Sequence, residues 1–251
     1  MNIGIYLGTF NPPHIGHLNC LYSALNTKLV DRILVVPAFH NPWKKKGLEF
    51  DPNNHNGMTL DEEFFLREKL CDAMFKDLID KGKVRVSDIE YLIWRRSHRY
   101  AEDVVYSHET LSKIKNIMYD DSYNLGWEDI DNIDLEDLHD GKKESPKFVI
   151  VTTVETLVTI PDWKEGKWIL ANFPIIAMSC QHMSSSDIDP NKEEILKRAS
   201  IFGGVDLPIH STLIRERWLN GQHILPFVNK EVYYLLADNA DNVTKLWKDI
   251  K

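Results

Sequence analysis

The sequence has few cysteines, no long apolar run and no leader pattern. Its 251 residues include three cysteines, Cys20, Cys71 and Cys180, and an odd number at wide spacing argues against a disulfide framework and for a reducing compartment. No apolar run approaches the roughly 18 residues of a membrane span. The first residues lack the basic stretch and apolar core of a signal peptide. We therefore expect a cytoplasmic protein without a membrane partner.

Positive charge is absent from one stretch of the chain. Residues 116–141 contain no Lys or Arg but nine Asp or Glu, whereas the whole chain has 30 basic and 38 acidic residues, a net charge of −8. The other residues therefore carry 30 basic against 29 acidic side chains, a net of +1. Because the chain shows no basic field, we expect no nucleic-acid partner. The acidic stretch predicts a surface insertion at about 118–141.

Apolar runs that suit buried strands alternate with segments of helical spacing. This alternation predicts an α/β fold, a Rossmann-like doubly wound parallel sheet with helices on both faces, and a site beyond the carboxyl ends of the strands. We expect a single domain, 1–251, with a C-terminal helical part at about 211–251. The expected strands are 3–7, 32–37, 84–86, 148–151, 174–178 and 205–209, and the expected helices include 16–26, one that begins after Thr59 with Glu62 in capping-box position, 107–114, 211–219 and 230–238.

The most informative segment is Gly8-Thr-Phe-Asn-Pro-Pro-His-Ile-Gly-His-Leu, residues 8–18. A strand leads into a glycine turn, and His14 and His17 then stand at the opening of a helix. The helix amides and the positive end of its dipole favour an anion there, and the two histidines lie on one face and add donors. This arrangement suits a phosphate and the charge that develops on it during a displacement.

Two other interpretations of these histidines remain. His14, His17 and Cys20 could form a metal cluster, although a glycine and two prolines before the first ligand are not what a zinc site requires, and no second ligand group is evident. Alternatively, the histidines only cap the helix. The complete eleven-residue string favours the phosphate interpretation over both.

The string resembles the nucleotide-binding signature of the nucleotidyltransferase superfamily, which includes mononucleotide adenylyltransferases, pantetheine-phosphate adenylyltransferase, cytidylyltransferases and class I aminoacyl-tRNA synthetases. A later segment, Ile209-His-Ser-Thr-Leu-Ile-Arg-Glu-Arg-Trp, resembles the second signature of the nicotinamide and nicotinate mononucleotide adenylyltransferases. Ser211 as N-cap would leave the first helix amides for phosphate oxygens, with a hydroxyl from Thr212 and a planar cation from Arg215. The alternative is a capped amphipathic helix whose arginines are solvated.

The resemblance implies an adenylyltransferase that joins ATP to a pyridine mononucleotide and releases pyrophosphate. It implies His14, His17 and Arg215 as catalytic residues, and Mg²⁺, bound chiefly through the ATP phosphates, as cofactor. The residues that it implies at ATP and its phosphates are Gly8, Thr9, Phe10, Lys44, Ser211 and Thr212, and those at the mononucleotide are Ser107, Glu155 and Trp163. Trp163 would stack on the pyridine ring; core packing is the alternative for this residue.

The chain departs from the family pattern at Thr153-Val154-Glu155, where relatives usually have Gly-x-Asp. This departure motivates a second hypothesis, a catalytically weak nucleotide-binding protein that uses the pocket for sensing. Another small-molecule nucleotidyltransferase is a further alternative, but the pantetheine-phosphate and cytidylyl enzymes do not explain residues 211–215 together with Trp163. The preference for the amide or the acid mononucleotide stays open. So does the oligomeric state, for which the resemblance makes a homo-oligomer possible.

Overall fold

The computed structural model describes residues 1–39, 58–97, 104–117, 147–179, 193–204, 207 and 209–248. The predicted phosphate contact Lys44 and the predicted acidic insertion at about 118–141 lie outside the described residues. Among the helices in the described ranges, none is both long enough and apolar enough to cross a bilayer.

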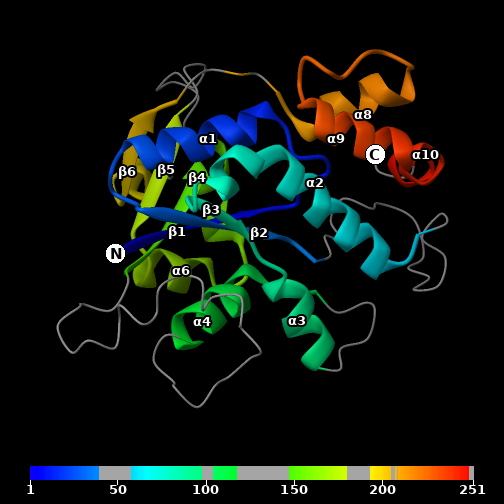
Figure 1. Ribbon diagram of the computed structural model, residues 1–251. Coiled ribbons are helices and arrows are strands. Elements are labelled where there is room, and N and C mark those ends of the chain that lie inside the picture. Colours follow the sequence, from blue (N-terminus) through cyan, green and yellow to red (C-terminus); the bar gives the residue numbers. More distant parts are fainter. Residues whose placement is uncertain are drawn as a thin grey trace.

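A six-stranded sheet forms the centre of the fold (Figure 1). Its strands are β1 (Asn2–Gly8), β2 (Arg32–Pro37), β3 (Val84–Val86), β4 (Lys147–Thr153), β5 (Ile175–Ser179) and β6 (Ala199–Gly203). They lie in the order β3-β2-β1-β4-β5-β6, and all neighbouring pairs are parallel. The direction of winding changes between β1 and β4, where sheets of this type bind ligands at their carboxyl ends. The predicted Rossmann-like parallel sheet is confirmed.

The central strands are covered on both faces, which explains their apolar composition. β1 pairs with β2 and β4, so that Ile5 lies between Leu34 and Ile150, and all three side chains are buried. A parallel strand with helices on both sides reads as a continuous Val and Ile run instead of an alternating pattern. For this reason the sequence locates these strands well.

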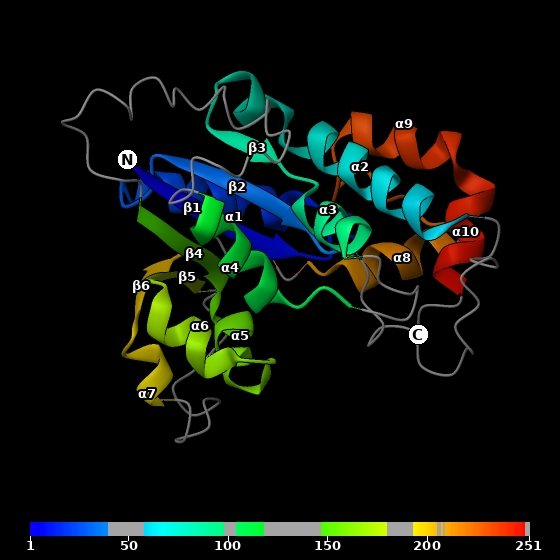
Figure 2. The ribbon, with the colours of Figure 1, turned by 90° about the horizontal axis from the view of Figure 1, so that it is seen from below.

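Helices cover both faces of the sheet and complete two cores (Figures 1 and 2). One face carries α1 (Ile15–Asn26) and α2 (Leu60–Asp80). The other face carries α3 (Ile89–Arg96), α4 (Ser107–Ile117), α5 (Val154–Leu157) and α6 (Gly166–Asn172). The short helices η3 (Ile160–Asp162) and α7 (Glu193–Leu196) precede α6 and β6. The capping box predicted at the start of α2 is present, because Thr59 and Glu62 bind each other's backbone N–H groups.

Three helices form the C-terminal part, namely α8 (Ser211–Leu219), α9 (Lys230–Asp238) and α10 (Ala240–Lys248). The bounds of α8 and α9 are those expected from the sequence. All three helices contribute to the core that α1 and α2 share with the sheet. The buried indole of Trp247 in α10 donates from Nε1 to Oδ1 of Asn11 at 2.8 Å. The last helix therefore reaches the loop that follows the first strand.

The last strand is not where the sequence predicts it. We expected residues 205–209, whereas β6 is Ala199–Gly203, and the described residues Leu207 and Ile209 lie outside any strand. β6 is an edge strand whose side chains are half-buried or exposed, with Ile201 at 42%, so it has no continuous apolar run. Leu207 and Ile209 instead line a cavity. Their apolar side chains are therefore explained by their place in the cavity wall and not by a strand.

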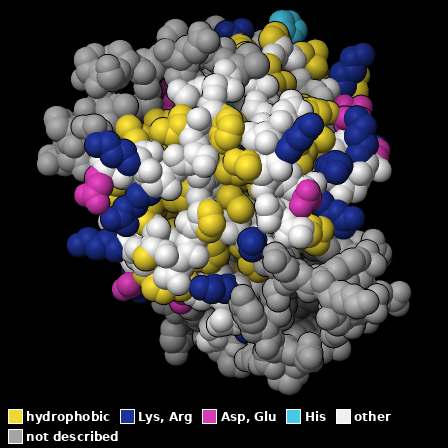
Figure 3. Space-filling model, turned by 90° about the vertical axis from the view of Figure 1, so that its left-hand side faces the viewer, with side chains coloured by type: hydrophobic (Ala, Val, Ile, Leu, Met, Phe, Trp, Pro, Cys, Tyr) yellow, Lys and Arg dark blue, Asp and Glu magenta, His cyan; other side chains and the backbone are white. Residues whose placement is uncertain are grey.

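The side of the molecule at the β6 edge, at the left of Figure 1, has a mixed surface. Figure 3 shows hydrophobic side chains in the middle of this face, with Lys and Arg more evident around them than Asp and Glu. This agrees with the sequence, in which residues 116–141 hold the excess of acidic side chains.

Candidate active site

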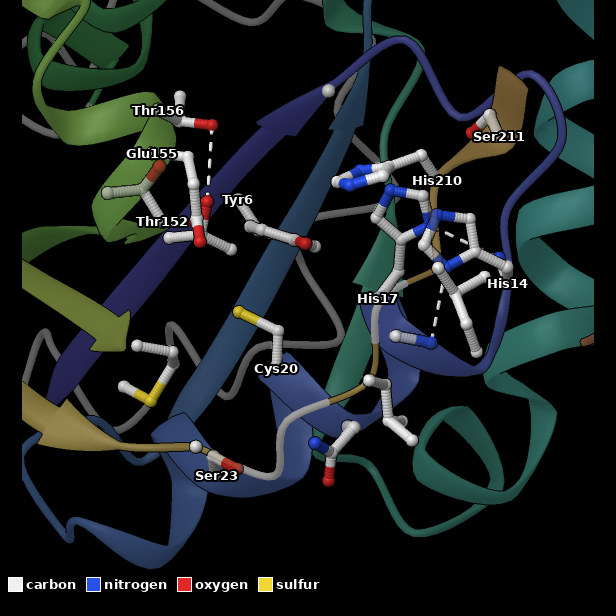
Figure 4. Close-up of a pocket in the computed structure, with 18 of the residues that line it drawn as sticks. Tyr6, His14, His17, Cys20, Ser23, Thr152, Glu155, Thr156, His210 and Ser211 are labelled. Atoms are coloured by element: carbon white, nitrogen blue, oxygen red, sulfur yellow. Dashed lines mark hydrogen bonds between the residues drawn. The ribbon is translucent and has the colours of Figure 1, made fainter. Parts of the chain in front are cut away.

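A cavity of about 460 Å³ lies beyond the carboxyl ends of β1, β4 and β5 (Figure 4). The first turns of α1, the start of α5 and the segment that leads into α8 form its walls. It therefore occupies the place that the topology of the sheet assigns to a ligand. Its lining includes seven residues that the sequence predicted for the site: Gly8, Phe10, His14, His17, Glu155, Ser211 and Thr212.

A close contact between Gly8 and Phe10 shapes the loop after β1. Phe10 is buried and has a φ of +50°, and its ring lies so near Gly8 that a Cβ there would be 2.8 Å from it. The ring meets His17 edge-on, with 5.0 Å between the centroids. Gly8 is therefore required by the approach of Phe10, which in turn packs against a histidine of the cavity wall.

His14 and His17 together cap α1. Nδ1 of His14 accepts a hydrogen bond from the N–H of Gly16, and Nδ1 of His17 accepts one from the N–H of His14, both at 3.1 Å. Because Nδ1 is an acceptor in both rings, each neutral ring carries its proton on Nε2. The capping interpretation is thus correct, but it does not exclude the phosphate interpretation, since both rings also line the cavity.

His14 is uncharged at neutral pH. The side chain is 5% exposed, and burial, with a smaller effect of the charge on His210, lowers its pKa to about 4. The ring therefore presents a neutral Nε2–H donor at the positive end of the α1 dipole. A bound polyphosphate would raise this pKa, because a nearby negative charge favours the imidazolium.

The low pKa of His14 predicts a pH dependence of stability. In the unfolded chain His14 takes up a proton near pH 6.5, whereas the folded protein keeps it neutral down to about pH 4. Its contribution to the free energy of unfolding is therefore complete above pH 6.5 and falls by about 3 kcal/mol as the pH is lowered to 4. Urea unfolding of the wild type and of His14→Asn at pH 7.5 and pH 5 measures this, because Asn also caps helices but does not titrate. A stability difference between the two proteins that is the same at both pH values would contradict it.

The prediction that Ser211 is the N-cap of α8 is wrong. The helix begins at Ser211, after His210 as N-cap, and the Ser211 hydroxyl donates to the carbonyl of Pro12 at 2.9 Å. The Ser211 hydroxyl therefore binds the loop after β1, whereas the sequence-based prediction placed it at the first amides of α8. No side chain caps α8, so its first amides still suit an anion.

His210 is a cavity residue that the sequence patterns do not identify. Its side chain is exposed and lines the cavity, and Figure 4 shows it beside His14 and His17. The signal that could have found it is its position directly before Ser211, at the N-cap of a helix predicted to face phosphate. The cavity thus brings together three histidines from the starts of two helices.

Arg215 is buried beside the cavity and is absent from its lining. Its Nη1 donates to the carbonyl of Asn11 at 2.8 Å, and its Nη2 donates to Oγ1 of Thr212 at 3.0 Å. The alternative of a solvated Arg215 is therefore wrong. In this arrangement Arg215 supports the loop after β1 and orients a hydroxyl that lines the cavity.

The predicted mononucleotide contacts fall into two groups. Glu155 is exposed at the start of α5 and lines the cavity. Ser107 and Trp163 do not line it, but their segments lie together, because Lys164 Nζ stands 4.0 Å from the ring centroid of Tyr106. Trp163 is half-buried, packs against the core of the second face, and donates from Nε1 to Thr159 Oγ1 at 3.1 Å. The core-packing interpretation of Trp163 therefore holds in part.

Thr9 has a backbone contact instead of a place in the cavity lining. Its carbonyl accepts a hydrogen bond from Arg67 Nη1 at 2.9 Å. Across the described residues, no group of three His, Cys, Asp or Glu side chains is arranged to hold a metal ion. The His14, His17 and Cys20 cluster therefore gains no support as a metal site.

The fold and this cavity define an α/β protein whose site, at the carboxyl ends of its strands, suits a phosphorylated ligand. No protein-family profile matches the chain. Curated relatives include the probable nicotinate-nucleotide adenylyltransferase of Maridesulfovibrio salexigens, 26% identical over 99% of this chain and 100% of that protein. The enzyme of the same name from Carboxydothermus hydrogenoformans is 28% identical, over 94% of this chain and 96% of that protein.

Solved structures give the same result for the fold. The nicotinic acid mononucleotide adenylyltransferase of Plasmodium falciparum, complexed with NaAD, superposes with a TM-score of 0.58 at 18% identity, over 96% of this chain and 98% of that chain. Its complex with APC has a TM-score of 0.58 at 16% identity, over 100% of this chain and 98% of that chain. The curated relatives and the solved structures thus show that the chain is similar to nicotinate-nucleotide adenylyltransferases and shares their fold.

Proposed function

We propose that the protein transfers AMP from ATP to nicotinate or nicotinamide mononucleotide, forming the acid form of NAD or NAD, and releases pyrophosphate. The observation that carries this proposal is the convergence of the histidine-capped start of α1 and the start of α8 on one cavity. The names of the relatives indicate that a pyridine mononucleotide is the acceptor of AMP. They also favour the acid, nicotinate mononucleotide, as the preferred one.

In the proposed reaction a 5′-phosphate oxygen of the mononucleotide attacks the α-phosphorus of ATP. The new P–O bond forms as the bond to the β-phosphate oxygen breaks, and pyrophosphate leaves with that electron pair. No covalent enzyme intermediate is needed, so catalysis consists of positioning and electrostatic stabilisation. The Nε2–H groups of His14 and His17 are placed to donate to the phosphates, and Thr212 and the first amides of α8 to bind the triphosphate.

Other predicted residues enter the proposal with different roles. Arg215 acts as a positioning residue, because its guanidinium holds the loop after β1 and Thr212. Lys44, outside the described residues, contacts phosphate. Ser107 and Trp163 hold the pyridine end of the mononucleotide, and Glu155 binds ribose at the cavity wall.

The cavity fits a magnesium ion that arrives with ATP. Mg²⁺ prefers octahedral oxygen ligands, and the described lining of the cavity offers one carboxylate, that of Glu155. Phosphate oxygens and water would supply the other ligands. The ion would neutralise charge on the leaving pyrophosphate.

An assay with ATP, Mg²⁺ and each mononucleotide tests the proposed function. We expect pyrophosphate and a dinucleotide, with kcat/KM higher for nicotinate mononucleotide by at least about 10-fold, the effect of one well-placed hydrogen bond to a charged group. ATP binding without pyrophosphate from either acceptor would contradict the transfer reaction and favour the weak nucleotide-binding protein, to which the Thr153-Val154-Glu155 departure points. A higher kcat/KM for the amide would overturn the acid preference alone.

A further inference from the structure

Two buried charges outside the cavity contact the segments that carry the proposed substrate contacts. Arg67 in α2 and Glu90 in α3 are each 3% exposed, and neither lines the cavity. A buried charge is unfavourable unless it is well paired, and apolar residues at such positions are often equally stable or more stable. The presence of Arg67 and Glu90 is therefore better explained by the groups that they hold than by stability alone.

The guanidinium of Arg67 binds the backbone beyond the ends of two strands. Its Nη1 donates to the carbonyls of Thr9 at 2.9 Å and Ala38 at 2.7 Å, and its Nη2 donates to the carbonyl of Phe39 at 2.8 Å. The N–H of Ala38 also donates to the carbonyl of Gly8 at 2.8 Å. The loops after β1 and β2 are thus joined directly and through Arg67. A planar fork of donors suits this geometry, and a Lys ammonium does not reproduce it.

The carboxylate of Glu90 holds Phe39 from the other side. Oε2 accepts from the N–H of Phe39 at 2.9 Å, and Oε1 accepts from the hydroxyl of Thr110 at 3.1 Å. The N–H and the carbonyl of Phe39 are therefore fixed by opposite charges, while its ring packs on Trp94 with 4.6 Å between the centroids. Burial raises the pKa of Glu90 to about 7, because removal from water disfavours the charged carboxylate.

These hydrogen bonds reach three segments of the proposed site. Thr9 belongs to the loop between β1 and the histidine cap. Phe39 follows β2 and leads toward the stretch that contains Lys44. Thr110 lies one turn after Ser107 in α4. Arg67 and Glu90 thus join the loop after β1, the residues that follow β2, and helix α4.

Resting on the proposed function, we infer that Arg67 and Glu90 are positioning residues that set the relative placement of these three segments for the transfer step. In-line attack requires the two substrates to be aligned closely. A misplacement of about 1 Å, caused by a change far from the reacting atoms, lowers the rate by about 100-fold. Loss of the hydrogen bonds of Glu90 or Arg67 therefore acts on kcat more than on KM.

Glu90→Gln and Glu90→Leu form a matched pair. Gln offers its oxygen to the N–H of Phe39 and its amide to the Thr110 hydroxyl, which then accepts, so the arrangement is kept; Leu offers neither. We expect kcat to fall about 10- to 100-fold in Glu90→Leu and by less than about 3-fold in Glu90→Gln, with smaller changes in both KM values. Thr110→Val, which keeps the branched shape of the side chain and removes its hydroxyl, should lower kcat by about 3- to 10-fold.

Glu63→Gln is the control for charge at the same place. Glu63 Oε1 is 3.8 Å from Nε of Arg67, so Glu63→Gln removes a negative charge beside Arg67 and keeps the shape of the side chain. We expect kcat within about 2-fold of wild type, because the hydrogen bonds of Arg67 to the loops after β1 and β2 remain. Equal kcat in Glu90→Leu and Glu90→Gln, or losses that match the unfolded fraction of each variant, would overturn the inference.

Amide hydrogen exchange separates this inference from the proposed function. If the wild type releases no pyrophosphate with either acceptor, the proposed function fails but the exchange test remains. Faster exchange of the amides of residues 8–11 and of Val36, Ala38 and Phe39 in folded Glu90→Leu than in Glu90→Gln supports the positioning role. Equal exchange in the two variants overturns it.

Discussion

His17→Ala is expected to lower kcat by about 100- to 1,000-fold, the usual effect of removing one preorganised donor to a developing negative charge. ATP affinity should change by less than about 5-fold, because the donor acts mainly in the transition state. Steady-state kinetics give kcat, and calorimetric titration with ATP in the absence of the mononucleotide gives the affinity. A kcat equal to that of the wild type would remove His17 from the catalytic residues.

The capping role of His17 must be separated from its chemical role. Nδ1 of His17 accepts from the N–H of His14, so His17→Ala also loses a helix cap. Glu is favoured at this capping position, and His17→Glu should regain the stability lost in His17→Ala without regaining activity, since a carboxylate has no proton to donate. His223→Ala, at an exposed position outside the cavity lining, is the control and should keep full activity.

Gly166→Ala is expected to reduce the free energy of unfolding by about 3 kcal/mol or more, the range of overpacked sites with backbone neighbours. A Cβ at Gly166 would stand 1.9 Å from the carbonyl oxygen of Ile160 and 3.1 Å from the carbonyl carbon of Pro161. Backbone atoms cannot rotate away as a side chain does, so η3 or α6 must shift. Urea unfolding measures the loss.

Gly203→Ala is the matched control for this substitution. Gly203 lies in β6, and a Cβ there would meet no described atom within 4 Å. We expect its free energy of unfolding to stay within about 0.5 kcal/mol of wild type. Equal stability of the two alanine variants would show that the turn after Ile160 adapts, and would contradict the close packing at Gly166.

Because Trp163 lies in the same turn, Gly166→Ala should also raise KM for the mononucleotide.

Elements with a strong local pattern could be predicted from the sequence. β1, β2 and β5 are continuous apolar runs, and α2 begins at a capping box, so neighbouring residues determine them. β6 has no such pattern, because an edge strand needs no apolar residue on its open side. The prediction placed the last strand at residues 205–209 instead, where the apolar residues Leu207 and Ile209 line the cavity.

The part of the site that lies within one short sequence motif, residues 8–18, could be predicted. His14 and His17 are capping and cavity residues at once, as the string around them indicates. The hydrogen bond from Ser211 to Pro12 spans 199 residues, so no local rule could assign it. Arg67 did leave a signal, because it stands in the apolar stripe of α2 between Phe64 and Cys71. A charge at a core position of a helix points to a buried partner.

The contacts of the loop after β1 also determine when the site can exist during synthesis. Asn11 and Pro12 are made at least 199 residues before their partners Ser211, Arg215 and Trp247. At about 5–20 residues per second, the loop waits roughly 10–50 s on the ribosome for the helices that hold it. Over that interval the apolar faces of α1 and α2 lack their C-terminal cover. The loop after β1 therefore takes its final arrangement only after α8 and α10 have been made.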